Sequence, residues 1–393
     1  MVMPRAVSVG LSVVLAVAAF VPFAWRPQPA SWAFETAAPP APAADEAPEM
    51  TAQYLLAGFP TPLTHAPSAA EAANGDLLVA WYGGSAEGDS DVGIYLSRSR
   101  DAGAIWSAPR RIVDRDLAQR ASGLYVKAIG NPSIGRDAGG RLWLFYVATV
   151  SGWSTAWVEF IRSDDDGRTW STPRRLYTAP GWNFSTLVRA PPLFYRDGRI
   201  GLPAYHEGFR KLSEWVVLDG DGVVLDKIRI SKGRGSIQPS VVALDDFSAV
   251  AFMRPVEAPL EVLMATTRNG GRSWTATRST GLASPDSANV GLGLDDETVL
   301  LAWNDHPRWR ASLALALSSD GGTSWPARKQ IDRRPKPWVS PWPDAEFTVA
   351  YPALLRTRDG RIHLFYAYAR SAIKHVSFNR AWLDSAVRPK TGQ

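Results

Sequence analysis

Residues 99–106 of the chain read SRDAGAIW, and the same pattern returns at residues 163–170 (SDDDGRTW), 267–274 (TRNGGRSW) and 318–325 (SSDGGTSW). The pattern Ser/Thr-x-Asp/Asn-x-Gly-x-x-Trp suits a β-hairpin turn. Its hydroxyl and its carboxylate or amide can bond turn N–H groups, and its glycine tolerates a positive φ. The tryptophan can fold back as an apolar plug. Four copies indicate that one supersecondary unit is repeated along the chain.

A second repeat accompanies the turn motif. Short segments, most of them containing proline, each lead into a tight turn and an apolar strand. They begin at residues 65 (HAPS), 130 (GNPS), 189 (RAPP), 237 (IQPS), 287 (SANV) and 350 (AYPA). Residues 218–222 (LDGDG) stand where the third unit would carry the turn motif, and the sixth unit has none. The sixth unit would lack it if a strand from the other end of the chain closes that blade.

These repeats define six units of roughly 48 to 65 residues, each long enough for a four-stranded sheet. We therefore predict an all-β fold, a six-bladed β-propeller over residues 51–393, in which only short, protected strand edges remain. A β-sandwich is the alternative, but its strands would not repeat in this way.

Composition excludes several classes of function. The net charge is only +5 and no run of like charges occurs, so nucleic acid is not an expected partner. The chain has no cysteine, which excludes disulfides, thiolate metal sites and a cysteine nucleophile. The five histidines are scattered without ligand spacing, so we expect neither a metal site nor a cofactor.

The first 27 residues read as a targeting segment. An apolar run over residues 6–25 follows Arg5, and it is long enough for a membrane-spanning helix. Cleaved signal peptide and uncleaved membrane anchor both remain open. Residues 28–50 are rich in Ala and Pro, which predicts an extended, disordered spacer. We therefore expect the propeller on the periplasmic or extracellular side, attached to the inner membrane if the apolar helix is retained.

The segments that open the six units supply candidate binding residues. In a propeller the first strand of each blade lines the central channel, and the residue at its mouth faces any ligand there. The residues that we assign to this position are His65, Asn131, Arg189, Gln238, Asn289 and Tyr351. Any one of them could instead cap a strand or bond the turn backbone. Six polar residues at equivalent positions favour a shared site.

The chain resembles the sialidase (neuraminidase) superfamily, and more closely its BNR-repeat, or Asp-box, sialidase-like members. The resemblance covers about residues 60–384 and rests on the turn motifs, the six-unit period and four further segments. These are residues 81–92 (WYGGSAEGDSDV), 237–240 (IQPS), 350–353 (AYPA) and 373–376 (IKHV). It implies a propeller enzyme that holds a sugar carboxylate with three arginines. It also implies a tyrosine nucleophile paired with a glutamate, and an aspartate as acid/base.

Carried over residue by residue, the resemblance makes Tyr351 the nucleophile and Arg254 and Arg310 two of the three arginines. Glu87 or Asp89, in a Gly-rich loop, would be the acid/base.

Two positions depart from the family pattern. His65 stands near the place of the first arginine, which removes a permanent charge. Gln238 stands in place of the glutamate, and an amide cannot take the proton of a phenol. Glu207, Glu346 or His65 could substitute for that glutamate.

Three functions are compatible with this pattern. The first is an exo-α-sialidase-like glycoside hydrolase that releases a terminal acidic sugar, in which Tyr351 is the nucleophile. The second is a polysaccharide lyase acting on a uronate, with His65 beside Tyr351 in proton abstraction. The third is a non-catalytic glycan-binding propeller of the cell envelope. In each case the expected partner is an acidic glycan or polysaccharide, because Arg254 and Arg310 at one channel mouth would form an anion site.

Overall fold

The computed structural model describes residues 31–36, 46–179, 183, 185–208, 210–333 and 348–385. The predicted targeting segment, residues 1–27, lies outside the described residues, as does Glu346. Within the described ranges, no helix is both long and apolar enough to cross a membrane.

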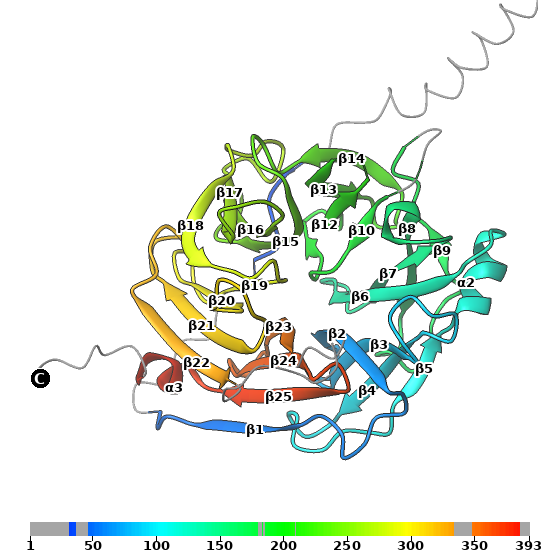
Figure 1. The fold of residues 1–393 in the computed structure, drawn as a ribbon, viewed down its shortest axis with the longest axis horizontal. Helices are drawn as coiled ribbons and strands as arrows, with labels where there is room; N and C mark the ends of the chain where they lie inside the picture. Colours follow the sequence, from blue (N-terminus) through cyan, green and yellow to red (C-terminus); the bar gives the residue numbers. More distant parts are fainter. Residues whose placement is uncertain are drawn as a thin grey trace, which may run out of the picture.

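Six antiparallel sheets stand in a ring, with the first strand of each sheet nearest the centre (Figure 1). Sequential strands are neighbours in almost every sheet, so each blade is a meander that runs outward from the axis. The predicted six-bladed propeller is confirmed.

The blades contain the following strands in chain order. Blade 1 has β2 (Leu63–Glu71), β3 (Leu77–Gly84), β4 (Gly93–Ser99) and β5 (Arg110–Val113). Blade 2 has β6 (Ala128–Arg136), β7 (Leu142–Thr149), β8 (Ala156–Ser163) and β9 (Arg174–Arg175). Blade 3 has β10 (Leu187–Val188), β11 (Leu193–Phe194), β12 (Ile200–Glu207), β13 (Lys211–Leu218) and β14 (Val224–Arg229).

The second half of the ring follows the same plan. Blade 4 has β15 (Ser236–Ala243), β16 (Ala249–Pro255), β17 (Glu261–Thr267) and β18 (Arg278–Ala283). Blade 5 has β19 (Val290–Gly293), β20 (Val299–Trp303), β21 (Ser312–Ser318) and β22 (Ala327–Arg333). Blade 6 has β23 (Val349–Arg356), β24 (Ile362–Tyr368), β25 (Ala372–Phe378) and, from the other end of the chain, β1 (Met50–Tyr54). The short helices α2 (Arg115–Ser122), η1 (Trp153–Thr155) and α3 (Arg380–Ser385) lie outside the sheets.

The ring is closed by the pairing of β1 with β25, which runs from Met50 opposite Phe378 to Tyr54 opposite Lys374. The outer edge of blade 6 is thereby covered by a strand that precedes blade 1. This explains why the sixth unit carries no turn motif, as the sequence predicted.

The turn motif has the predicted hydrogen bonds. In the first copy, Ser99 Oγ accepts from the N–H of Gly103 at 2.8 Å, and Asp101 Oδ1 accepts from the N–H of Ile105 at 2.9 Å. The other three copies repeat both contacts. Gly103 has a φ of 92°, a backbone conformation that would be strained in a residue with a side chain. The motif is therefore a self-contained turn between the third and fourth strands of a blade.

Each turn also joins its blade to the preceding one. Three of the four tryptophans make aromatic contacts across the gap, namely Trp106 with Phe365 and His375, Trp274 with Trp215, and Trp325 with Phe252. The motif glycine permits this approach, because a Cβ on Gly103 would lie 2.5 Å from the His375 ring. The repeated octapeptide thus accounts for both the turn and the packing between blades.

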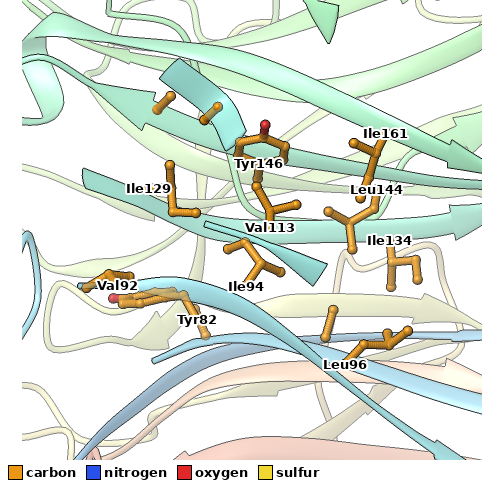
Figure 2. Packing of buried hydrophobic residues seen from close by; sticks show 14 of the residues in the cluster. Tyr82, Val92, Ile94, Leu96, Val113, Ile129, Ile134, Leu144, Tyr146 and Ile161 are labelled. Atoms are coloured by element: carbon orange, nitrogen blue, oxygen red, sulfur yellow. The ribbon is translucent and has the colours of Figure 1, made fainter. Parts of the chain in front are cut away.

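Apolar layers fill the spaces between blades. Figure 2 shows the layer between blades 1 and 2, where Ile94 and Leu96 of β4 face Ile129 and Ile134 of β6 and Leu144 of β7. Because successive strand residues point to opposite faces, each blade contributes one apolar face to each neighbour. These layers hold the inner strands around the channel.

The prediction of a disordered spacer over residues 28–50 is wrong for residues 31–36, which pack on blades 3 and 4. Phe34 is fully buried and stacks on Tyr195, with ring centroids 5.1 Å apart. Its N–H donates to the carbonyl of Asp246 at 2.7 Å, and Glu35 N–H donates to the carbonyl of Phe194 at 2.8 Å. The Ala/Pro-rich composition obscured the two aromatic residues, Trp32 and Phe34, that stabilise this contact.

The replacement Phe34→Ala should lower the free energy of unfolding by about 3 kcal/mol, because it removes a fully buried aromatic ring. Urea denaturation followed by tryptophan fluorescence measures this change. Thr36→Ala, at an exposed position of the same segment, should change stability by less than about 0.5 kcal/mol. Equal stability of Phe34→Ala and the wild type would show that the segment is not docked.

Candidate active site

Four of the inner strands break their ladder at the residue that precedes a proline. The pairing register of β2, β6, β15 and β23 shifts across a two-residue bulge. The residues before proline in these bulges are Ala66, Asn131, Gln238 and Tyr351, with φ values of 48°, 47°, 51° and 56°. A left-handed backbone is uncommon for residues other than glycine, and a bulge re-aims the side chain it carries. The bulges therefore place three functional side chains at the channel mouth.

The residue after the proline links the inner strands around the ring. Ser68 Oγ accepts from the N–H of Ile134 at 3.0 Å, joining blade 1 to blade 2. Ser240 Oγ accepts from the N–H of Gly291 at 3.0 Å, joining blade 4 to blade 5. Ser133 Oγ donates to the carbonyl of Ala190 at 2.6 Å, joining blade 2 to blade 3. The x-Pro-Ser segment therefore has two roles: its first residue lies at the site, and its serine links neighbouring blades.

The sequence alignment of His65 and Arg189 with Asn131 and Gln238 is wrong by one residue. Ala66 occupies the bulge position in β2, and His65 remains in the ladder opposite Tyr82. Arg189 lies in the interruption between β10 and β11. Asn289 precedes β19, whose ladder has no register shift. His65 and Arg189 nevertheless reach the site, from neighbouring backbone positions.

One aspartate joins the two predicted arginines. Arg254 Nε donates to Asp286 Oδ1 at 2.7 Å, and Arg310 Nη2 donates to the carbonyl of the same residue at 2.6 Å. Burial opposes the charge on Arg254, but the neighbouring Tyr351 and Asp286 outweigh it and raise its pKa. Two guanidinium groups from blades 4 and 5 are thereby held side by side. Asp286 was not predicted; its signal is a carboxylate in the turn before the fifth inner strand.

Tyr351 lies against two of the other candidates. The His65 ring packs on it with centroids 4.3 Å apart, and the Arg189 guanidinium carbon lies 5.3 Å from the Tyr351 ring centroid. Burial lowers the pKa of Arg189 to about 10, so it remains a cation at neutral pH. Burial, and then the charges of Arg370, Arg310 and Arg189, hold the pKa of His65 well below its usual value. His65 is therefore neutral in this field.

A second tyrosine connects the remaining candidates, and the sequence analysis missed it. The Tyr205 hydroxyl accepts from Asn131 Nδ2 at 3.3 Å and from Gln238 Nε2 at 3.4 Å. Gln238 Oε1 in turn accepts from Arg254 Nη1 at 3.2 Å. Burial raises the pKa of Tyr205, so it stays a neutral phenol. Tyr205 lies two residues before the end of β12, and the sequence would identify it as a site residue only after blade 3 had been aligned with its neighbours.

Glu87 and Asp89 differ in their surroundings. Glu87 Oε2 accepts from Arg370 Nη2 at 2.6 Å, and burial followed by the charge of Glu87 raises the pKa of Tyr82. Glu87 is therefore at the mouth. Asp89 is exposed, and its carboxylate has no hydrogen bond or ion pair to the described part of the chain. The structure brings Glu87 to the channel mouth, and it places Asp89 at an exposed position of the same loop.

Several buried polar atoms at this mouth have no hydrogen-bond partner among the described residues. They are Thr64 Oγ1, His65 Nδ1 and Arg189 Nε. Buried polar groups are normally paired. Donors and acceptors of this kind around an arginine pair suit a polar, anionic ligand. The residues that the structure describes contain no group of three or more His, Cys, Asp or Glu able to hold a metal ion.

The sequence of blades 1 to 6 matches a known family. The model of the BNR repeat-like domain matches residues 75–364. The chain belongs to this family. Sialidases are similar to the chain in sequence and in structure, so the predicted assignment to the sialidase and BNR-repeat superfamily is confirmed.

Individual relatives are distant. A sialidase of Bacteroides fragilis is 22% identical over 282 residues, which are 64% of this chain and 51% of the relative, so the chain spans about half the length of that protein. The Hadza microbial sialidase Hz136 superposes with a TM-score of 0.68 at 21% identity, over 83% of this chain and 67% of the other. The intramolecular trans-sialidase of Ruminococcus gnavus gives 0.67 at 13% identity, over 84% and 96%. At such identities these structures establish the fold alone.

A Dyadobacter fermentans protein of unknown function is also similar in structure. It superposes with a TM-score of 0.65 at 16% identity, over 84% of this chain and 98% of that protein. Similarity of fold does not by itself specify an activity, so function must be argued from the site.

The change Tyr205→Phe should lower the free energy of unfolding by about 1–3 kcal/mol, because the amides of Asn131 and Gln238 lose their shared acceptor inside the protein. Chemical denaturation measures the loss. Tyr177→Phe, where the side chain is exposed, is the matched control and should be neutral. A neutral Tyr205→Phe would mean that the hydroxyl does not organise these amides.

Proposed function

We propose that this protein is a retaining glycoside hydrolase that releases a terminal acidic sugar, of the sialic acid type, from a glycan. Its sialidase-like fold is established, and the activity is our inference. The apolar run at residues 6–25 supports the further proposal that it meets its glycan outside the cytoplasm, on the periplasmic or extracellular side.

One observation carries the proposal: two guanidinium groups and a phenol converge at one end of the ring. Arg254 and Arg310 both hydrogen-bond Asp286, and the Tyr351 ring packs on His65 with the Arg189 guanidinium carbon 5.3 Å away. Guanidinium groups bind carboxylates through charge-assisted, paired hydrogen bonds. A sugar carboxylate held by this pair would bring its anomeric carbon toward Tyr351.

Tyr351 is then the nucleophile. Its phenol oxygen bonds to the anomeric carbon as the glycosidic C–O bond breaks, and water later releases the sugar from the tyrosine. Gln238 cannot accept the phenol proton, but neutral His65 packs directly on Tyr351. A bound carboxylate offsets part of the positive field around His65. The imidazole would therefore become a better proton acceptor once the anionic substrate is in place.

Incubation of the full chain with aryl glycosides of sialic acid and other acidic sugars tests this function. We expect release of the aryl alcohol, a loss of at least about 100-fold in kcat/KM for Tyr351→Phe, and a raised KM for Arg310→Lys. Absence of turnover of every acidic glycoside, together with unchanged binding in Tyr351→Phe, would contradict the proposal. Glycan binding without turnover would then identify the non-catalytic alternative.

Uronate lyase chemistry is the second candidate, and the contact between His65 and Tyr351 favours it. A phenol and an imidazole can together remove and return a proton beside a carboxylate that arginines neutralise. Its signature is a new ultraviolet absorbance from the unsaturated product of a uronate polymer. We expect no such absorbance, and its appearance would replace the hydrolase assignment.

A further inference from the structure

Strand β12 brings an additional carboxyl group to the channel mouth. Residues two apart on a strand point to the same face, so Glu207 follows Tyr205, whose hydroxyl bonds Asn131 and Gln238. Glu207 is the last residue of β12 and is half-buried. Its side chain therefore leaves the strand on the side of the site.

The residue between them confirms the alternation. His206 points to the other face of β12, where its Nε2 lies 2.8 Å from Lys227 Nζ and 2.8 Å from Glu214 Oε2. The backbone of Glu207 is itself fixed. Its N–H donates to Ser185 Oγ at 3.0 Å, and its carbonyl accepts from Ser154 Oγ at 3.1 Å. Glu207 thus presents its carboxyl group from an ordered strand end.

The carboxyl of Glu207 has no hydrogen bond or ion pair within the described part of the chain. Of the two loop carboxylates, Glu87 is paired with Arg370, and Asp89 is exposed. A proton donor must be free to exchange its proton with the substrate. Glu207 and Asp89 both meet that condition, and Glu207 is the one that is half-buried, at a strand end beside Tyr205.

The electrostatic surroundings of Glu207 also favour a role as proton donor. Burial raises the pKa of Glu207 above its usual value, against the charges of Lys211 on β13 and Arg254 on β16, and the charges of Asp286 and Glu87 add to the rise. A carboxyl with a raised pKa stays protonated closer to neutral pH, as a general acid requires. Enzymes commonly use such a difference in environment to keep one carboxyl protonated while a neighbouring carboxyl is ionised.

We propose that Glu207 is the general acid and base of this site, in place of the loop carboxylates Glu87 and Asp89. The role rests on the proposed glycoside hydrolase function. As the glycosidic bond breaks, its electron pair goes to the leaving oxygen, which takes the proton of Glu207. In the second step the Glu207 carboxylate takes a proton from water, whose oxygen bonds to the anomeric carbon as the tyrosine oxygen departs.

The test compares two substrates of the same acidic sugar in the full chain, one with a phenol-type aryl leaving group and one with a sugar leaving group. A sugar alkoxide needs the proton far more than an aryl oxide does. For Glu207→Gln we expect kcat/KM on the sugar-linked substrate to fall by about 10²–10⁴-fold and on the aryl substrate by less than about 10-fold. The basic limb of the wild-type pH profile, where activity falls as Glu207 loses its proton, should disappear.

Two further variants distinguish a catalytic role of Glu207 from a structural one. Glu207→Asp keeps an acid on a shorter arm and should show a smaller loss with the same preference for the aryl substrate. His206→Gln, on the opposite face of β12, should leave the ratio of the two activities unchanged. Equal losses on both substrates for Glu207→Gln, or a leaving-group preference in Glu87→Gln or Asp89→Asn instead, would overturn the role of Glu207. A wild type that hydrolyses neither substrate would overturn the proposed function itself, and this role with it.

Discussion

The left-handed residue before proline in the inner strands is the constraint on which the site depends. Ala66, Asn131, Gln238 and Tyr351 all adopt it, at the point where the ladder of their strand is interrupted. Such a conformation costs on the order of 1–3 kcal/mol at each residue and persists only where the surroundings enforce it. Here the interruption turns the side chain toward the channel mouth. In a regular strand, the Tyr351 side chain would follow the alternating direction of its neighbours and would point away from the arginines.

The rest of the propeller stabilises these strained positions. At the outer turns of the four blades that carry an Asp box, its tryptophan and glycine pack against the preceding blade, as Trp106 does against His375. Near the axis, the serine after the proline bonds the next inner strand, as Ser68 and Ser240 do. The pairing of β1 with β25 then closes the ring by joining the segment before blade 1 to blade 6. Polar groups on six different blades are in this way held at fixed separations, which is what a preorganised anion site requires.

The fold could be predicted from the sequence because its determinants are local and repeated. Each Asp box forms its turn from its own eight residues, so four copies specify four hairpins. The site was predicted in part. Arg254, Arg310, Gln238 and Tyr351 stand at strand ends that the repeat identifies. The alignment erred at His65, which stands two residues before Pro67, whereas the bulge residue of each interrupted inner strand directly precedes its proline. Tyr205 and Asp286 matter through contacts between blades, and the docking of Phe34 depends on a surface that exists only after blades 3 and 4 have folded.

The central claim is that the ring geometry makes the Tyr351 oxygen the nucleophile of an acidic-sugar hydrolase. Trapping with a fluorinated acidic glycosyl fluoride, which forms the glycosyl-enzyme quickly and releases it slowly, tests this most directly. Mass spectrometry of the digested protein should find one sugar attached to the peptide that contains Tyr351, and the label should be absent after excess competing acidic sugar. An active enzyme that carries the label on another residue, or none at all during turnover, would contradict the account.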